Sequence, residues 1–365
     1  MPAQTPLSAF SGSYATNDIH FLLRPVAIEM TPIALKEKLI QSGVNHYSDM
    51  LSYEPAPMPW HINLFNQALE QGKDRLATEV LALAQALIAQ FANTPIVLIS
   101  LVRAGVPLGV MLQQTLRTLG KSSYHYGVSI IRDRGIDTAA LSWIESQHGT
   151  DGIVFVDGWT GKGAISTELK RSLLGRAGYP ASPRLVVLAD PCGAAWLSAS
   201  DEDWLIPFGI MGAPVSGLIS RSIWSADGLH GCVVCEHLRA YDCSQHLVNT
   251  VAQQQATLSK VVAPLLPLAP SSTHKKNRQQ QSQAVIQELS TTYNIDSTNR
   301  IKPGIAEATR AVLRRVPDHV LVRCLADPDV ALLVYLAQEK AIPITELGAG
   351  TGPYRAITII KKVPV

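Results

Sequence analysis

The chain has 365 residues, of which 47% are apolar and 16% are charged, and its formal net charge is +2. This length favours two domains, and the apolar content is sufficient for hydrophobic cores, which excludes a wholly disordered protein. No apolar run reaches the roughly 18 residues of a membrane-spanning helix, and the first residues lack the basic start of a signal peptide. We therefore expect a cytoplasmic protein that has no membrane partner.

Helical and strand patterns alternate along the first two thirds of the chain. The spacing of apolar residues predicts three helices, over 75–91, 107–119 and 165–174. Short apolar runs predict four strands, at 96–100, 126–131, 153–156 and 185–189. Strands separated by helices are typical of a mostly parallel sheet with both faces covered. Ligands of such sheets bind at the loops that follow the carboxyl ends of the strands.

The loops after these expected strands carry residues that suit an anion. Residues 100–109 include Arg103 and a glycine, which offer a guanidinium and an accessible backbone to a phosphate. Residues 156–164, Val-Asp-Gly-Trp-Thr-Gly-Lys-Gly-Ala, combine glycines, a hydroxyl, a lysine and a helix start, although their spacing is not that of a P-loop. The other two loops are Arg132-Asp-Arg-Gly135 and Asp190-Pro-Cys-Gly193. Together they predict one site for an anionic ligand.

Two of these loops resemble the type I phosphoribosyltransferases. Ile153-Val-Phe-Val-Asp157 and Thr160-Gly-Lys-Gly163 resemble the strand and loop that hold the 5′-phosphate of phosphoribosyl pyrophosphate (PRPP), and 102–105 resembles the pyrophosphate loop. More narrowly, 10–260 resembles bacterial phosphoribosyltransferase-like proteins encoded with tellurium-resistance stress operons, which often carry the label cysteine protease StiP. Further matching stretches are Ser-Gly-Ser-Tyr near residue 11, and 131–137, 188–191, 212–223 and 230–232.

The resemblance implies a type I phosphoribosyltransferase-like α/β fold and Mg²⁺-dependent chemistry on PRPP. The catalytic residues that it implies are Asp157, Arg103 and Lys162. The PRPP-binding residues that it implies are Arg103, Ala104, Gly105, Arg132, Arg134, Asp157, Gly158, Thr160, Gly161, Lys162 and Gly163. Asp157 would orient the ribose hydroxyls, Thr160 and its loop would hold the 5′-phosphate, and Arg103 would face the pyrophosphate. Asp190 would meet a nucleobase-like acceptor.

The chain departs from the family pattern in the same loop. Typical members have two adjacent acids for the two ribose hydroxyls, whereas the second position here is Gly158. Trp159 stands just before the Thr-Gly pair, where an aspartate of purine-salvage members can serve as a base. These differences argue against ordinary purine salvage. Two alternatives remain open: transfer to another acceptor, and a fold that binds PRPP or a nucleotide without catalysis and regulates RNA.

Three of the five cysteines lie between residues 232 and 243. In a chain without an export signal, reduced thiols or a metal site are expected rather than disulfides. The pair Cys232 and Cys235, with His230, His237 and Cys243 nearby, has a spacing that zinc accepts. A buried strand over 231–235 explains the same residues, so we assign no metal ligand. A cysteine peptidase is another alternative for the function. It ranks third because no known protease signature surrounds any cysteine.

The composition changes most clearly at 263–283, where three prolines precede a polar run without apolar residues. This pattern predicts a linker that is stiff at first and then flexible. It divides the chain into a phosphoribosyltransferase-like domain at 1–262, the flexible linker at 263–283 and a second domain at 284–365. Residues 271–365 carry 13 Lys and Arg against 8 Asp and Glu, which favours a polyanion-binding domain, although solvated charge explains such an excess as well.

The second domain has its own pattern. Residues 301–316 resemble the RNA-contacting helix of pelota and of kink-turn-binding ribosomal proteins, and 320–325, 332–340 and 342–344 continue the same strand–helix–strand order. The resemblance implies that RNA is bound by Lys302, Gly304, Glu307, Arg310 and Arg314. Ala306 replaces the family's asparagine and Pro303 its lysine, so recognition of bases is expected to be weak. A domain used only for packing is the alternative.

We therefore expect two α/β domains that transfer the phosphoribosyl group of PRPP to a nucleobase-like or RNA-linked acceptor in a bacterial stress response. The C-terminal domain would bind structured RNA as an independent module, and a homodimer is possible. The rival hypothesis is a non-catalytic sensor of PRPP or of nucleotides that regulates RNA.

Overall fold

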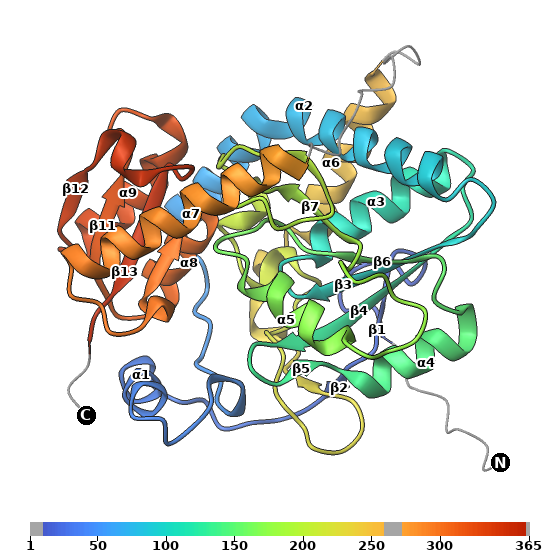
Figure 1. Cartoon of the computed structure of the whole chain (residues 1–365), viewed down its shortest axis with the longest axis horizontal. Coiled ribbons are helices and arrows are strands. Elements are labelled where there is room, and N and C mark those ends of the chain that lie inside the picture. The colour runs from blue at the N-terminus through green and yellow to red at the C-terminus, as the bar shows by residue number, and fades with distance from the viewer. Residues whose placement is uncertain (1–9, 259–271, 363–365) are drawn as a thin grey trace.

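A computed structural model describes residues 10–258, which we call the body, and residues 272–362, which we call the C-terminal domain (Figure 1). The body is built on a seven-stranded sheet. Its parallel strands follow the order β1 (His20–Phe21), β4 (Ser123–Ile131), β3 (Ile96–Val102), β6 (Ile153–Val156), β7 (Leu185–Ala189) and β8 (Leu197–Ser200). The short strand β5 (Gly135–Ile136) pairs with β4 in the antiparallel direction.

Helices cover both faces of this sheet, as Figure 1 shows. One face is covered by α2 (Pro59–Gln90), α3 (Val106–Thr118) and α6 (Ser244–Thr257), and the other by α4 (Thr138–His148) and α5 (Ala164–Leu173). Successive residues of β3 divide between the two layers: Leu98 lies in the hydrophobic cluster of α2 and α3, and Ile99 in that of α4 and α5. All seven residues of β3 are buried, which explains its continuous apolar sequence.

The C-terminal domain is a four-stranded sheet with helices on both faces. Its strands follow the order β10 (Ile301–Pro303), β13 (Ala356–Ile360), β11 (Pro317–Val322) and β12 (Ile344–Glu346). The helices are α8 (Ile305–Arg314) and α9 (Ala331–Glu339) on one face and α7 (Ser272–Thr292) on the other. The predicted fold class is thus confirmed: an α/β domain with a parallel sheet precedes a small α/β domain.

The remaining elements are short. They are β2 (Arg24–Pro25), α1 (Ile33–Gln41), β9 (Gly231–Cys232) and the 3-10 turns η1 (Tyr47–Asp49), η2 (Pro207–Gly209), η3 (Ala213–Val215), η4 (Glu236–Tyr241), η5 (Thr298–Arg300), η6 (Pro328–Val330) and η7 (Gly348–Thr351). None of the helices in the described ranges is both long and apolar enough to cross a membrane.

The predicted bounds agree best with the structure for buried strands that are flanked by turns. β6 and β7 have the predicted bounds, whereas α2 begins well before the predicted residue 75. The stretch 301–316 is not one helix, because 301–303 pairs with β13. Gly304, whose φ is 91°, then turns the chain into α8, and this left-handed backbone favours glycine.

The linker expected at 263–283 differs from the structure in its second half. Residues 272–283 form the first part of α7, while 263–271 lie outside the described residues. The run from 272 to 292 has no glycine or proline, so nothing in it interrupts a helix. Its polar side chains bind the body: Arg278 pairs with Asp201 (2.6 Å) and Lys275 donates to the carbonyl of Trp196 (2.8 Å). The helix therefore ties the two domains together.

The two domains also share one hydrophobic cluster. Trp159 and Phe208 of the body belong to the same cluster as Ile305 and Ala306 of α8. A Cβ added to Gly209 would lie 2.9 Å from that of Ala306, so the backbones approach each other closely there. The C-terminal domain is therefore packed against the body. A flexible linker predicts few contacts between the domains, whereas the structure has a shared hydrophobic cluster.

Asp203 of the body holds the C-terminal domain through backbone groups. Its carboxylate accepts hydrogen bonds from the N–H groups of Ile305 (2.9 Å) and Arg355 (2.7 Å). The side chain is buried, and burial raises its pKa to about 6 although these N–H groups oppose the rise. A buried acceptor that serves two chain segments stabilises the interface between the domains.

We expect Asp203→Asn to lower the free energy of unfolding by about 1–3 kcal/mol, because one amide oxygen replaces two acceptors and the amide nitrogen faces a donor. Urea unfolding of the full chain at neutral pH measures this change. The matched control is Asp227→Asn, since Asp227 is exposed and its side chain has no hydrogen bond within the described ranges. Equal losses in both variants would contradict the assigned role.

Candidate functional site

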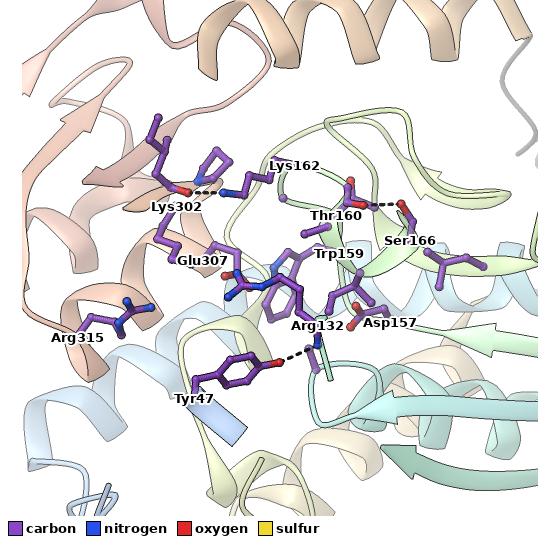
Figure 2. Close-up of a pocket in the computed structure, with 18 residues that line it drawn as sticks. Tyr47, Arg132, Asp157, Trp159, Thr160, Lys162, Ser166, Lys302, Glu307 and Arg315 are labelled. Carbon is purple, nitrogen blue, oxygen red and sulfur yellow. Dashed lines mark hydrogen bonds between the residues drawn. The ribbon is translucent and has the colours of Figure 1, made fainter. Parts of the chain in front are cut away.

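A cavity of about 270 Å³ lies between the domains where β6 ends, and we call it the loop pocket. The body contributes residues 157 and 159–166, from the loop after β6 and the first turn of α5, and the C-terminal domain contributes β10 and the first turn of α8. The charged residues that line it are Arg132, Asp157, Lys162, Lys302, Glu307 and Arg315. Figure 2 shows Asp157 and Thr160 on one side and Lys302, Glu307 and Arg315 on the other.

Asp157 follows β6 directly, so the strand delivers its carboxylate to the edge of the sheet. The residue is 8% exposed and accepts a hydrogen bond from the N–H of Gly158 (2.8 Å). Burial raises the pKa of Asp157 to about 7, against the effect of this N–H group, and the charge of Glu307 adds to the rise. A carboxyl group that ionises near neutral pH in a cavity is suited to binding or proton transfer.

The structure gives a steric reason for the glycine that replaces the family's second acid. A Cβ on Gly158 would lie 2.9 Å from the carbonyl oxygen of Ala104 and 3.2 Å from the ring of Phe208. A carboxylate therefore does not fit at this position. Ala104 itself lines the loop pocket, and Gly105 packs so tightly on Val156 that an added Cβ would lie 2.0 Å from its carbonyl oxygen.

Thr160 and Asp190 form one buried unit. The hydroxyl of Thr160 donates to Asp190 (2.6 Å), which also accepts the N–H groups of Ala194 and Ala195 (both 2.9 Å). Asp190 is 2% exposed and is not among the residues that line the loop pocket. Its expected contact with an acceptor is therefore corrected: the carboxylate is fully used inside the body, where it positions Thr160.

The rest of this loop faces the C-terminal domain. Gly161 and Gly163 line the pocket, and the carbonyl of Gly161 accepts the hydroxyl of Tyr354 (2.8 Å). Lys162 donates to the carbonyl of Thr298, and burial, then the charge of Arg132, lower the pKa of Lys162 to about 8. The loop thus borders both the pocket and the domain interface.

The expected arginines are divided among different places. Arg132 lines the loop pocket and donates to Asn299 (3.0 Å) of the C-terminal domain. Arg103, expected at the pyrophosphate, instead lines a separate cavity of about 320 Å³, because Glu54 pairs with it (2.7 Å). Arg134 is held by both carboxylate oxygens of Asp49 and lies outside the loop pocket. For these two arginines the predicted position is corrected, since long-range carboxylates decide where each guanidinium points.

The expected RNA-contacting face of the C-terminal domain is turned toward the body. Arg310 donates to the carbonyl of Gly209 (3.1 Å), and its guanidinium lies 4.5 Å from the ring centre of Trp159. Glu307 lines the loop pocket, and Arg314 approaches Gly212 so closely that an added Cβ would lie 2.7 Å from a guanidinium nitrogen. The prediction of an open RNA surface on an independent module is therefore corrected.

The start of α8 is also occupied. Gly304, an implied RNA-binding residue, stands before the first backbone N–H group of α8, but that group, on Ile305, donates to Asp203. Lys302 remains in the loop pocket, where burial and the charge of Arg315 lower its pKa to about 7. Arg315, one residue beyond α8, pairs with the buried Glu37 of α1 (2.6 Å).

Sequence reasoning missed two body residues that shape this region. The hydroxyl of Tyr47 accepts the N–H of Arg132 (2.9 Å), and its ring lies 5.2 Å from the guanidinium of Arg221. Arg221 in turn donates to the carbonyls of Tyr47 and Met50. No motif marks either residue. Arg221 lies in the stretch 212–223, which contributes to the family resemblance but has no predicted role.

The five cysteines are free thiols. Burial raises the pKa of Cys192 and Cys232 to about 12 and of Cys235 and Cys243 to about 11. Cys235 and His237 line the same cavity, but His237 is hydrogen-bonded to the carbonyl of Glu54 (2.9 Å). Over residues 10–258 and 272–362, no three His, Cys, Asp or Glu side chains come together as a metal site. Cys232 and Cys235 are buried, as the buried-thiol alternative expects, whereas Cys243 is partly exposed.

Comparisons with known proteins match both parts of the chain. Residues 12–252 match the family "Tellurite-like stress resistance cysteine protease StiP", and 280–362 match the "PELOTA RNA binding domain". A hypoxanthine phosphoribosyltransferase of Trypanosoma cruzi complexed with IMP shares 15% identity, with a TM-score of 0.29 over 53% of this chain and 94% of that chain. A likeness of that size says nothing about the reaction.

A protein of Acinetobacter baylyi named "Cysteine protease StiP" is 50% identical over an alignment 368 residues long. The alignment covers 97% of this chain and 95% of that protein. The similarity therefore extends through the body, the loop pocket and the C-terminal domain. With the match to residues 12–252, it shows that the chain belongs to the StiP family of tellurite-like stress resistance and ends in a PELOTA RNA-binding domain.

Proposed function

We propose that the chain transfers the phosphoribosyl group of PRPP to an acceptor of the nucleobase or RNA class, and that the loop pocket is the site. One observation carries the proposal. The loop from Asp157 to Gly163 joins a buried parallel strand to a helix, and it lines a cavity together with Arg132 of the body and Lys302 and Arg315 of the C-terminal domain. A carboxylate, a hydroxyl, glycine backbone and a helix start in this order suit a phosphorylated sugar.

The proposed reaction breaks the bond between the anomeric carbon and the pyrophosphate oxygen. The electron pair of that bond leaves with pyrophosphate, the acceptor nucleophile forms the new bond to carbon, and its proton passes to water. Asp157 would hold a ribose hydroxyl and stabilise the positive charge that develops on the sugar. Arg132, Lys162 and Lys302 would neutralise the pyrophosphate as it gains charge. In this mechanism the backbone of 161–164 holds the 5′-phosphate.

Mg²⁺ is the cofactor that this reaction implies, and the residues of the loop pocket fit it. The pocket offers the carboxylates of Asp157 and Glu307, and oxygen ligands are those that Mg²⁺ prefers. Glu307 has no hydrogen bond or ion pair from its side chain within the described ranges. When bound with PRPP, the ion would supply charge neutralisation at the leaving pyrophosphate.

The rival proposal, a sensor that binds PRPP or a nucleotide without turnover, uses the same pocket. Release of pyrophosphate distinguishes the two. A cysteine peptidase is less favoured, although the Acinetobacter baylyi relative has that name. A thiol nucleophile needs a base within hydrogen-bond reach, and none of the described cysteines is hydrogen-bonded to a histidine.

The first expectation is that PRPP with Mg²⁺ binds the full chain and that Asp157→Asn weakens binding at least about tenfold, as loss of a charged hydrogen-bond acceptor does. Isothermal titration calorimetry measures both affinities. The control is Asp227→Asn on the exposed surface, which should bind like the parent chain. Absence of heat with the parent chain, or equal affinity in all three proteins, would rule out the proposed site.

Relative to Asp157→Asn, the parent chain should gain affinity for PRPP as pH rises from 6 to 8. Because the pKa of Asp157 is raised to about 7, its ionised fraction grows about tenfold over this range, and the ionised form is the one that binds Mg²⁺ and hydroxyl groups. Ionisation of PRPP and loss of charge on Lys302 and Lys162, whose pKa values are lowered to about 7 and about 8, also act over this range. The reference is therefore the profile of Asp157→Asn. The two profiles should differ by up to about tenfold, and parallel profiles would contradict the role of Asp157.

The thiols should be dispensable. Cys232→Ser, Cys235→Ser and Cys243→Ser should each keep PRPP binding within about twofold, because thiols with a pKa near 11 or 12 are not thiolates at neutral pH. In the native chain, mild alkylation followed by mass spectrometry should label the exposed Cys324 first. Loss of activity in one variant with an unchanged free energy of unfolding, or stoichiometric zinc by elemental analysis, would refute this expectation.

A further inference from the structure

A second cavity, of about 520 Å³, adjoins the loop pocket, and we call it the cationic cleft. The two cavities share five lining residues, namely Tyr47, Arg132, Lys302, Glu307 and Arg315. The body forms one wall of the cleft, from α1 to Arg221, and the C-terminal domain forms the other, from η5 to α8. A ligand in the cleft therefore lies directly beside a ligand in the loop pocket.

Positive charge dominates the lining of the cleft. Nine lysine and arginine residues line it: Lys36, Arg132, Arg221, Arg300, Lys302, Arg310, Arg314, Arg315 and Lys362. Two acids face them, and one of these, Asp296, already pairs with Arg300 (3.1 Å) and Lys362 (2.8 Å). Even with Glu37, which pairs with Arg315 from outside the lining, the acids are fewer than the cations.

Three of these cations feel nearby carboxylates but form no direct contact with them: Glu37 acts on Lys36, Glu307 acts on Lys302, and Glu54 and Glu307 act on Arg314. Within the described ranges, the side chains of Lys36, Lys302 and Arg314 make no hydrogen bond or ion pair, whereas Arg310 and Arg315 do. Lys36 is only 8% exposed. A buried ammonium without a counter-ion is costly, since burial of a charge is offset only by pairing. These three groups therefore point to an anion that the protein does not provide.

The electrostatics of the same residues agree with this conclusion. Burial, and next the charge of Arg221, lower the pKa of Lys36 to about 8. Burial and Arg103 lower the pKa of Arg314 to about 9, and Lys302 is affected in the same direction. Burial is the largest cause of each shift and neighbouring cations add to it, whereas Glu37, Glu54 and Glu307 oppose it. A bound anion would favour the charged form of all three groups.

We propose that the cationic cleft binds the phosphate of a nucleotide, and that this nucleotide is the acceptor of the phosphoribosyl group. The acceptor role rests on the function proposed above, whereas the binding does not. A phosphate ester, which has several oxygens and up to two negative charges, suits a cavity that these three cations line. The wall that carries Lys302 and Arg314 belongs to the part of the chain that matches an RNA-binding domain, which favours a nucleotide over other phosphate esters.

The volume of the cleft limits the form of this nucleotide. A cavity of about 520 Å³ is in the range of small-ligand sites. The walls are held together by bonds such as that of Arg132 to Asn299 and that of Arg315 to Glu37. A double-stranded helix does not fit between them. The source is therefore a free mononucleotide or the single-stranded end of an RNA.

The experiment titrates the full chain without PRPP with the four 5′-mononucleotides, their nucleosides, inorganic phosphate, 5′-phosphorylated RNA tetranucleotides and a 12-base-pair RNA duplex. At least one mononucleotide or tetranucleotide should bind at least about tenfold more tightly than the matching nucleoside. Comparable affinities for the mononucleotide and the tetranucleotide would identify a free nucleotide as the source. A preference of more than about tenfold for the tetranucleotide would identify an RNA end.

The decisive variant is Lys36→Gln, with Lys38→Gln as its matched control. Both lysines lie in α1, but Lys38 is exposed and lines neither cavity. Lys36→Gln should weaken the binding at least about tenfold and lower the salt slope for the tetranucleotide by about 0.7. Lys38→Gln should change neither. The free energy of unfolding of each variant, measured in urea, separates a binding loss from a folding loss, and Lys302→Gln provides a second variant.

Four outcomes would overturn the proposal: no nucleotide probe binds, Lys36→Gln and Lys38→Gln bind equally, inorganic phosphate binds as tightly as every nucleotide, or the duplex binds more tightly than the tetranucleotide. PRPP binding without nucleotide binding would overturn this inference alone. Nucleotide binding without PRPP binding would confirm the cleft and overturn the acceptor role together with the proposed function. Pyrophosphate release from PRPP that requires the bound nucleotide would support both.

Discussion

The buried carboxylate of Asp203 accepts N–H groups from Ile305 and Arg355 and so fixes the start of α8 against the body. Trp159 and Phe208 lie in one cluster with Ile305, which adds an apolar contact beside this polar one. The position of α8 then determines the rest of the site, because the loop pocket has one wall from each domain. The C-terminal domain also contacts the loop after β6 directly, through Tyr354 to Gly161 and Lys162 to Thr298.

The same contact gathers cations that repel one another. The loop that carries Lys162 and the strand that carries Lys302 meet at the loop pocket. The pKa of Lys162 is lowered to about 8 and that of Lys302 to about 7. Such an arrangement costs stability and persists only because the surrounding packing holds it. Polar clusters of this kind are typical of sites that bind a ligand of opposite charge. The interface is thus both a structural contact and a region rich in charged side chains.

Part of the candidate site follows from local sequence. Asp157, Thr160 and Lys162 lie where the order of strand, loop and helix predicts, because a buried strand fixes where the following residues emerge. Arg103 and Arg134 do not, since Glu54 and Asp49 lie far from them in the sequence and draw each guanidinium away. A long flexible side chain takes its direction from such distant partners, and no local pattern records them.

The sequence by itself determined the two α/β domains, the glycine-rich loop after β6 and the cluster of cations around residues 302–315. Each depends on residues that are neighbours in the chain, so periodicity and composition reveal it. Only the tertiary structure decided that these cations face the body, and that the polar run from 272 becomes a helix bound to Asp201. A pattern shows which residues share a face of a helix, but what covers that face depends on contacts between distant segments, which form only when the chain folds.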